Sequence, residues 1–330
     1  MNPPYSDHRA IREGPSIHGI WVNALSDLVG EIQELAQEAN VQPIPLPGYW
    51  LYRKDAEGAS RIVELARDEE KVLYSLHGGG YFGLSAHPST QVVPEESLRI
   101  SDRKSDDVCG PAHKVLLRNV DCGPHVRRIF SIEYRLSTCA PFPAQLIDAL
   151  AGYHYLVHTV GFKPDNIIVE GDSAGGHLTL SLARYLVEHI PKMKPGALLL
   201  FSPWCDLSVQ GQDTESMLFE GDYIPRDTSN SVRLLMGSLK IQMASTSRWI
   251  SPARVGRFEG FPKTLILAGS AEVLRDQIRE LTGKMKRDSG EENIDYVEIE
   301  DAVHDTLVLV RREPETRKTF ERIAEWIREL

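Results

Sequence analysis

The sequence lacks several features that mark other classes of protein. It has no run of about 18 apolar residues, so no transmembrane helix is predicted. The N-terminal stretch MNPPYSDHRAIREGP carries charges and prolines where a secretory signal needs an apolar run, and we therefore expect a cytoplasmic protein. Basic residues are outnumbered by acidic ones, 37 to 47, which gives a formal net charge of −10. That charge argues against nucleic acid or an anionic membrane as the main partner.

Cysteine is also scarce. The four cysteines are Cys109, Cys122, Cys139 and Cys205. No two of them form a Cys-x-x-Cys pair, and no histidines stand at zinc-ligand spacing beside them, so neither a redox motif nor a zinc site is predicted. We expect reduced thiols with structural roles. A disulfide between Cys109 and Cys122, which share a loop-like stretch, is the leading alternative.

Short apolar runs rich in β-branched residues alternate with longer segments of helical periodicity. The runs predict strands at 71–76, 129–134, 166–170, 197–202, 264–268 and 296–299. Three- and four-residue spacing predicts helices within 17–40 and at 144–157, 175–188 and 314–330. This alternation predicts a single α/β domain over residues 1–330. Its central sheet is expected to be mostly parallel, with helices on both faces.

Two stretches interrupt the alternation. Residues 86–126 are polar and are predicted to be a surface insertion, whereas residues 206–250 break the sheet after the strand at 197–202. Long interruptions of a compact domain often have a function, and we interpret 1–50 together with 206–250 as a candidate helical cap. Trp21, Leu25, Leu218, Phe219 and Tyr223 would then either line an apolar substrate pocket or simply pack the cap against the body.

A glycine-rich turn follows the strand predicted at 166–170. It reads Gly171-Asp172-Ser173-Ala174-Gly175-Gly176 and leads into a helical segment, so Gly-x-Ser-x-Gly stands between a strand and a helix, as a nucleophile elbow requires. Side chains two residues before and after Ser173 would collide with the neighbouring strand and helix, which explains both glycines. A turn that packs closely for structural reasons, or one that binds phosphate, is the alternative.

The strand predicted at 71–76 ends in His77-Gly78-Gly79-Gly80-Tyr81. Acyl transfer passes through an oxyanion, which preorganised N–H donors stabilise by roughly 3–4 kcal/mol each. We predict the N–H groups of Gly78, Gly79 and Ala174 as these donors. The glycines could instead form only a flexible loop, and His77 is expected to anchor that loop by hydrogen bonding.

These motifs carry a family resemblance. HGGGY followed by GDSAGG resembles the paired signature of the hormone-sensitive-lipase-like branch of the α/β-hydrolases. The resemblance continues in YRL at 134–136, PFPAQLIDAL at 141–150 and SPWCDLS at 202–208. It covers roughly residues 70–310, and the 86–126 segment is longer than the family usually has. It implies the α/β-hydrolase fold with a helical cap.

The remaining site residues are expected near the C-terminal end of the chain. His304, in the sequence Asp-Ala-Val-His-Asp just after the last predicted strand, has the position of the catalytic base in this fold. Family members usually carry aspartate where Glu272 stands, in an Asp-x-Leu-x-Asp pattern. That register implies Glu272 as the acid that orients His304, with Asp276 as a supporting residue or the alternative acid.

The resemblance implies a serine hydrolase that cleaves small to medium carboxylic esters through an acyl-enzyme on Ser173. No metal or organic cofactor is implied, and a small-molecule ester is the expected partner. An amidase or lactonase in a biosynthetic pathway remains open, as does a homodimer. A different class is a small-molecule receptor on the same scaffold, in which the histidine is lost. The presence of His304 counts against that alternative.

Overall fold

The computed structural model describes residues 7–12, 18–52, 63–87, 126–208, 221–225, 227–309 and 314–330. Nearly all of the predicted insertion at 86–126 lies outside these ranges. So do Cys109 and Cys122, with the disulfide considered for them, and the two predicted cap residues Leu218 and Phe219. Cys139 and Cys205 are free thiols, the first exposed and the second buried.

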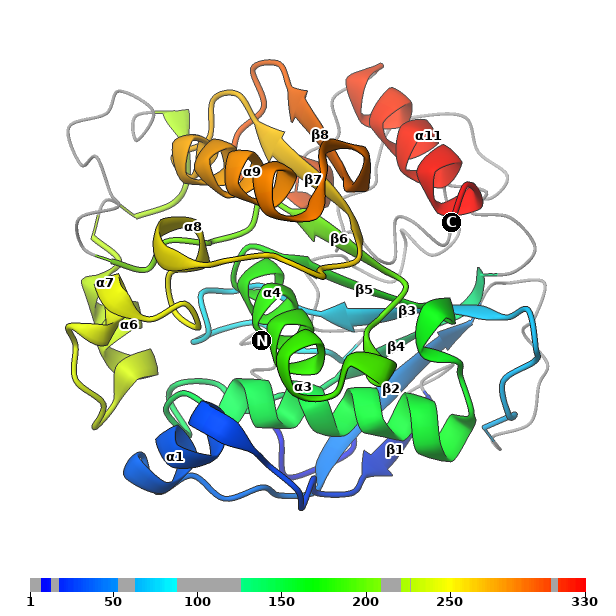
Figure 1. Cartoon of the computed structure of the whole chain (residues 1–330), viewed down its shortest axis with the longest axis vertical. Coiled ribbons are helices and arrows are strands. Elements are labelled where there is room, and N and C mark those ends of the chain that lie inside the picture. The colour runs from blue at the N-terminus through cyan, green and yellow to red at the C-terminus, as the bar shows by residue number, and fades with distance from the viewer. Residues whose placement is uncertain are drawn as a thin grey trace.

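One sheet organises the described part of the chain (Figure 1). Its strands, in sequence order, are β1 (His18–Val22), β2 (Leu46–Tyr52), β3 (Lys71–Leu76), β4 (Val126–Ile132), β5 (Ile167–Asp172), β6 (Ala197–Phe201), β7 (Lys263–Gly269) and β8 (Ile294–Ile299). Their spatial order is β1-β2-β4-β3-β5-β6-β7-β8. The pairings of β2 with β1 and β4 are antiparallel, and every pairing from β4 to β8 is parallel. The predicted mostly parallel sheet is confirmed.

Helices connect and cover these strands. They are α1 (Gly30–Glu38), α3 (Ala144–His154), α4 (Ala174–His189), α6 (Ser229–Met236), α7 (Met243–Thr246), α8 (Pro252–Val255), α9 (Arg275–Ser289), α10 (Thr306–Leu309) and α11 (Glu315–Arg328). The helices predicted at 144–157, 175–188 and 314–330 correspond to α3, α4 and α11. After α3 the chain continues in a π-helical segment, Tyr155–Val160, that ends at Gly161 with a left-handed φ of 88°.

The core has two layers because successive strand residues point to opposite faces of the sheet. The larger apolar cluster joins one face to α1, α3, α4 and α9, and the smaller cluster joins the other face to α11. In β6, for example, Leu198 and Leu200 belong to the first cluster, and Leu199 and Phe201 belong to the second. The strands that are buried on both faces therefore form the continuous apolar runs seen in the sequence.

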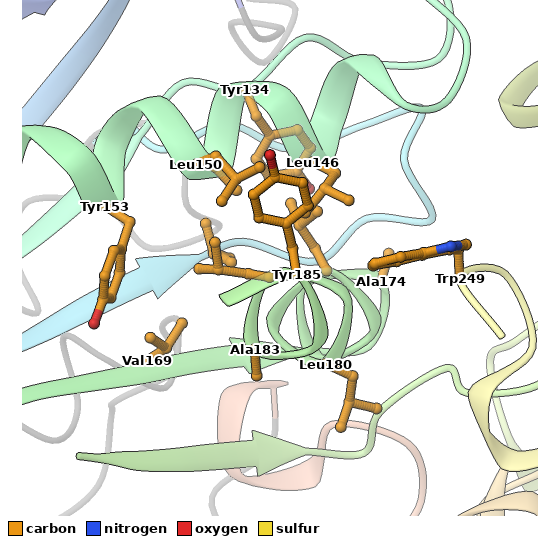
Figure 2. Packing of buried hydrophobic residues seen from close by; sticks show 14 of the residues in the cluster. Tyr134, Leu146, Leu150, Tyr153, Val169, Ala174, Leu180, Ala183, Tyr185 and Trp249 are labelled. Carbon is orange, nitrogen blue, oxygen red and sulfur yellow. The ribbon is translucent and has the colours of Figure 1, made fainter. Parts of the chain in front are cut away.

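The larger cluster fixes α4 between α3 and the strands (Figure 2). Leu146 and Leu150 of α3 point toward Tyr185 of α4, and Val169 of β5 lies beneath them. All four side chains are at most 3% exposed, so each contributes roughly 1.5–3 kcal/mol through burial of apolar surface. This packing holds α4, the helix that begins at Ala174 directly after the glycine-rich turn, against α3 and the sheet.

The helix predicted within 17–40 is wrong for its first part. Residues His18–Val22 form strand β1, which pairs with β2, and the helix α1 begins only at Gly30. Ile20 and Val22 alternate as strand residues do, and this local period was hidden by apolar positions farther along that fit a helical spacing. Strand β2 was not predicted, because prolines at 43, 45 and 47 indicated only the end of a helix.

The candidate cap contains elements of two kinds. Of residues 1–50, β1 and most of β2 belong to the sheet, whereas α1 lies outside it. Of residues 206–250, the described part holds α6 and α7. The two cap segments meet: Glu31 of α1 accepts a hydrogen bond from Trp249 Nε1 at 2.7 Å and pairs with Arg248 at 3.3 Å. A cap built from α1, α6 and α7 stays a prediction.

Within the described ranges, no helix is long and apolar enough to cross a membrane. The expected cytoplasmic location and the homodimer stay predictions.

Candidate active site

The carboxyl ends of the parallel strands meet at one edge of the sheet, and the predicted site residues gather there. His77 follows β3, Ser173 follows β5, and Glu272 lies just beyond the end of β7. His304 lies in the loop after β8. Strand order therefore brings together residues that are far apart in the sequence, at the edge where open α/β sheets bind ligands.

Ser173 has the strained backbone of a nucleophile elbow. It joins β5 directly to α4 with φ 52° and ψ −116°, a conformation that non-glycine residues rarely adopt. Glycine stands two residues before Ser173 and two residues after it. A Cβ atom on Gly171 would lie 2.3 Å from the carbonyl oxygen of Gly175, and one on Gly175 would lie 1.9 Å from that of Leu76. Both motif glycines therefore meet the collision that the sequence argument anticipates.

His304 reaches Ser173 across 131 positions of sequence. Its Nε2 atom lies 2.9 Å from Ser173 Oγ, and its side chain is 1% exposed. The ring of Tyr223 lies against it, with centroids 5.6 Å apart and planes at 50°. Of the residues predicted to line the cap, Tyr223 is thus placed beside the site, whereas Trp21 is 49% exposed.

Glu272 is the carboxylate nearest the other edge of the imidazole. It is fully buried, and its Oε2 atom lies 3.9 Å from His304 Nδ1, which is longer than a hydrogen bond. Oε2 accepts hydrogen bonds from Ser202 Oγ at 2.5 Å and from the Gly269 N–H at 3.1 Å. These neutral donors fix the carboxylate without cancelling its charge, so that the charge remains directed at the imidazole.

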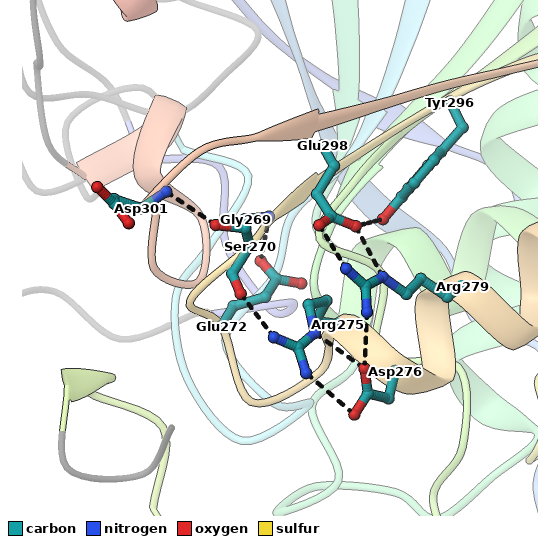
Figure 3. Close-up of polar contacts among 9 residues, drawn as sticks. All are labelled: Gly269, Ser270, Glu272, Arg275, Asp276, Arg279, Tyr296, Glu298 and Asp301. Atoms are coloured by element: carbon teal, nitrogen blue, oxygen red, sulfur yellow. Dashed lines mark hydrogen bonds and ion pairs between the residues drawn. The ribbon is translucent and has the colours of Figure 1, made fainter. Parts of the chain in front are cut away.

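Asp276 lies elsewhere. It is in the first turn of α9 with its side chain 71% exposed, and it pairs with Arg275 at 2.8 Å and Arg279 at 3.4 Å. Figure 3 shows Asp276 pointing to these arginines, on the far side of the loop from Glu272. The geometry favours Glu272 over Asp276 as the acid of the triad.

The site concentrates buried negative charge. Burial raises the pKa of Glu272 to about 7, against the opposing effects of His304, Ser202 and the Gly269 amide. Burial and, to a smaller extent, the nearby Asp305 likewise raise the pKa of Asp172 to about 7. For His304, burial alone lowers the pKa, but Asp305, Glu272 and Asp222 outweigh burial and raise it to about 9.

The predicted oxyanion loop lies beside the elbow. Asp172, which precedes the nucleophile, accepts a hydrogen bond from the Gly78 N–H through Oδ1 at 3.0 Å. The Gly78 amide is therefore directed to a carboxylate in this state and not toward an open position above Ser173. Gly79 has a left-handed φ of 94°, and Ala174 is the first residue of α4, where helix amides are unpaired.

His77 supports the loop. Its Nδ1–H donates to the Gly78 carbonyl at 2.8 Å, and its ring stacks on Tyr134 with centroids 4.2 Å apart. Tyr134 in turn donates its hydroxyl proton to the His77 carbonyl at 2.5 Å. Burial lowers the pKa of His77 to about 4, so the ring is neutral at physiological pH. These contacts suit the anchoring role expected for His77.

Three residues that contact the site were not predicted from the sequence: Ser202, Asp172 and Asp305. Each was within a quoted motif, but nothing in its local spacing indicated a role. Ser202 directly follows β6 and lies under Glu272, and Asp305 directly follows His304 with its carboxylate 3.1 Å from Nε2. A search for polar residues at the carboxyl end of every predicted strand would have found Ser202.

The arrangement can perform nucleophilic chemistry with general-base assistance. A serine hydroxyl on a strained turn, an imidazole at hydrogen-bond distance and a buried carboxylate behind it are the parts that activate such a nucleophile. Among the residues that the structure describes, no group of three or more His, Cys, Asp or Glu side chains is arranged to hold a metal ion.

Known proteins resemble this chain in sequence and structure. Residues 122–308 match a family described as alpha/beta hydrolase fold. An esterase of Acinetobacter venetianus is 28% identical over 279 residues, which cover 83% of this chain and 78% of that protein. The crystal structure of an esterase from the bacterial hormone-sensitive lipase family superposes with a TM-score of 0.65 at 24% identity, covering 97% of this chain and 86% of the other. A structure soaked with p-nitrophenyl butyrate superposes with a TM-score of 0.63 at 23% identity, covering 97% and 87%.

Proposed function

The chain belongs to the α/β-hydrolase family, and on that premise we propose that it hydrolyses carboxylic esters through an acyl-enzyme formed on Ser173. One relative of the chain is named an esterase, and its structural neighbours include an esterase of the hormone-sensitive lipase family. The observation that carries the proposal is the distance of 2.9 Å between Ser173 Oγ, on its strained turn, and His304 Nε2.

In the first step, Ser173 Oγ attacks the ester carbonyl while His304 Nε2 takes the hydroxyl proton. The imidazolium that forms is stabilised by Glu272, which Ser202 and Gly269 hold in place. The tetrahedral oxyanion is bound by backbone N–H groups, for which Gly79 and Ala174 are the proposed donors. The Gly78 N–H joins them if Asp172 releases it when substrate binds.

The first step ends when His304 gives its proton to the leaving alcohol oxygen as the C–O bond breaks, which leaves the acyl-enzyme on Ser173. In the second step the acyl-enzyme is hydrolysed, and the neutral imidazole removes a proton from water. The resulting hydroxide equivalent attacks the acyl carbon, and Ser173 leaves with the proton from His304. The products are an acid and an alcohol, and the enzyme returns to its starting state.

The test uses p-nitrophenyl acetate, butyrate and octanoate with the wild type and Ser173→Ala. We expect turnover of at least the shorter esters by the wild type and a loss of at least ~10³-fold in kcat by the variant. Retained turnover in Ser173→Ala would overturn the mechanism. The same assay with amides and lactones of matched acyl groups decides between an esterase and the two related hydrolase activities.

A further inference from the structure

Asp305 occupies an unusual place beside the base. It directly follows His304, has a left-handed φ of 50°, and is 6% exposed. Its Oδ2 atom lies 3.1 Å from His304 Nε2, and its backbone N–H donates to Ser202 Oγ at 3.2 Å. Among the described residues, its other carboxylate oxygen has no hydrogen-bond partner. The carboxylate is therefore directed to the imidazole alone.

Asp305 and Ser173 share one nitrogen of His304. Ser173 Oγ lies 2.9 Å from Nε2, and Asp305 Oδ2 lies 3.1 Å from the same atom. As a general base, Nε2 must carry a lone pair that accepts the serine proton. A carboxylate oxygen can only accept, so it is attracted to Nε2 when that nitrogen bears a proton and repelled by its bare lone pair. The two neighbours favour opposite protonation states.

The contacts of Nδ1, at the other edge of the ring, do not decide between these two protonation states. His304 Nδ1 lies 3.9 Å from Glu272 Oε2 and, within the described ranges, makes no hydrogen bond. Nδ1 is thus held loosely, whereas Nε2 is in direct contact with a carboxylate. The resting site holds the imidazole by the edge that must become free for catalysis.

We propose that Asp305 is a positioning residue that competes with Ser173 for Nε2 of His304 and holds the imidazole in its proton-bearing, inactive form. The proposal rests on the function proposed above for Ser173 and His304. Catalysis then begins from the fraction of enzyme in which Nε2 has lost its proton. In the transition state the same carboxylate stabilises the imidazolium, so Asp305 makes the base stronger but less often available.

Charged groups from several elements face His304. Glu272 approaches from the loop after β7, Asp172 from the end of β5, and Asp222 from the segment before α6, which also places Tyr223 against the ring. Burial lowers the pKa of His304, but Asp305 is the strongest of the influences that raise it to about 9. Glu272 and Asp172, each with a pKa near 7, will also contribute to the pH profile.

The substitution Asp305→Asn keeps the shape of the side chain and removes its charge. The pKa of His304 should fall, and the acid limb of kcat/KM should move to lower pH by at least about one unit. At pH values below the limb, each unit of displacement raises kcat/KM about tenfold. Above the limb, the variant should be slower than the wild type because a weaker base remains.

The experiment measures the rate of Ser173 modification by a fluorophosphonate between about pH 5 and about pH 10, because this rate reports on the base without a known substrate. Asp222→Asn is the matched control. It loses the same charge, and its amide oxygen can still accept the Val273 N–H bond that Asp222 Oδ2 accepts at 2.9 Å. The displacement should be clearly larger for Asp305→Asn than for Asp222→Asn. Asp305→Ala, which also lacks the charge, replaces Asp305→Asn if thermal unfolding shows that the asparagine variant is not folded.

The outcomes separate the two proposals. If the acid limb of the Asp305 variant coincides with that of the wild type or of Asp222→Asn, the role of Asp305 is wrong and the hydrolase function stands. If the wild type does not react with the probe at any pH, the proposed function fails, and the role of Asp305 fails with it.

Discussion

Glu272 and Asp276 are carboxylates four positions apart in the sequence. One is buried and the other is exposed, and this difference gives them different roles. Glu272 is fully buried and held by a serine hydroxyl and a backbone amide. Asp276 is 71% exposed and held by two arginines (Figure 3). A carboxylate with neutral partners keeps its charge for the imidazole, whereas one paired with guanidinium groups has its charge neutralised at the surface.

The different surroundings of Glu272 and Asp276 also shift the pKa values of the two carboxyl groups in opposite directions. Burial raises the pKa of Glu272 to about 7, whereas the hydrogen bond from Arg275 lowers the pKa of Asp276. Asp276 is therefore ionised throughout the working range, but its field is screened by solvent and cancelled by its partners. Glu272 has a less favourable ionisation but acts through a medium of low polarity, in which each charge has a larger effect.

Of the substitutions that test this comparison, Glu272→Gln is expected to have the largest effect on activity. The amide keeps the shape of the side chain but cannot stabilise the imidazolium, so kcat should fall about 10³-fold or more. The measurement is steady-state hydrolysis of p-nitrophenyl butyrate near pH 8, with circular dichroism to confirm folding. A loss smaller than about tenfold would show that Glu272 is not the orienting acid.

A smaller effect is expected for Ser202→Ala. Ser202 Oγ donates to Glu272 Oε2 and accepts the Asp305 N–H, so its loss loosens two carboxylates at once. Loss of one donor worth about 1.4 kcal/mol lowers kcat about tenfold. Because Ser202 lowers the pKa of Glu272, that pKa should rise further in the variant. Ser202→Thr, which retains a hydroxyl, is the control and should recover part of the rate.

The smallest effect is expected for Asp276→Asn. Its ion pairs with Arg275 and Arg279 are exposed, so kcat/KM should change less than about twofold and the free energy of unfolding by less than about 1 kcal/mol. Chemical denaturation and the same ester assay measure both quantities. If Asp276→Asn lost as much activity as Glu272→Gln, the division between the two carboxylates would be wrong.

The surface network around Asp276 continues to β8. Arg279 also pairs with Glu298 at 2.6 Å, and Tyr296 donates its hydroxyl proton to the same carboxylate at 2.6 Å. This arrangement joins α9 to the neighbouring strand. It holds the helix that follows the Glu272 loop, so its contribution to the site is one of support.

Local patterns predicted most of the fold. Buried parallel strands form continuous apolar runs, and the prediction of β3 at 71–76 matches the structure residue for residue. The strand β1 was misassigned because helical spacing farther along hid its short alternation, and its pairing with β2 is a tertiary interaction. Ser173 was predicted from its motif and His304 from its place after the last strand, and the structure brings the two side chains to 2.9 Å from each other.

The rest of the site depends on contacts between distant residues. Ser202 reaches Glu272 over 70 positions, and Asp305 reaches Ser202 over 103. Neither contact can be predicted from the spacing of neighbouring residues in the sequence. The choice between Glu272 and Asp276 likewise depends on which side chain the loop after β7 turns inward. The order of residues in the sequence allows both.

The most direct test of the central claim is the mass of the protein after reaction with a fluorophosphonate. We expect one adduct on the wild type, which peptide mapping should locate at Ser173. Within the same reaction time, no adduct should form on Ser173→Ala or on His304→Ala. An adduct at another residue, or equal labelling of the Ser173→Ala variant, would contradict the claim.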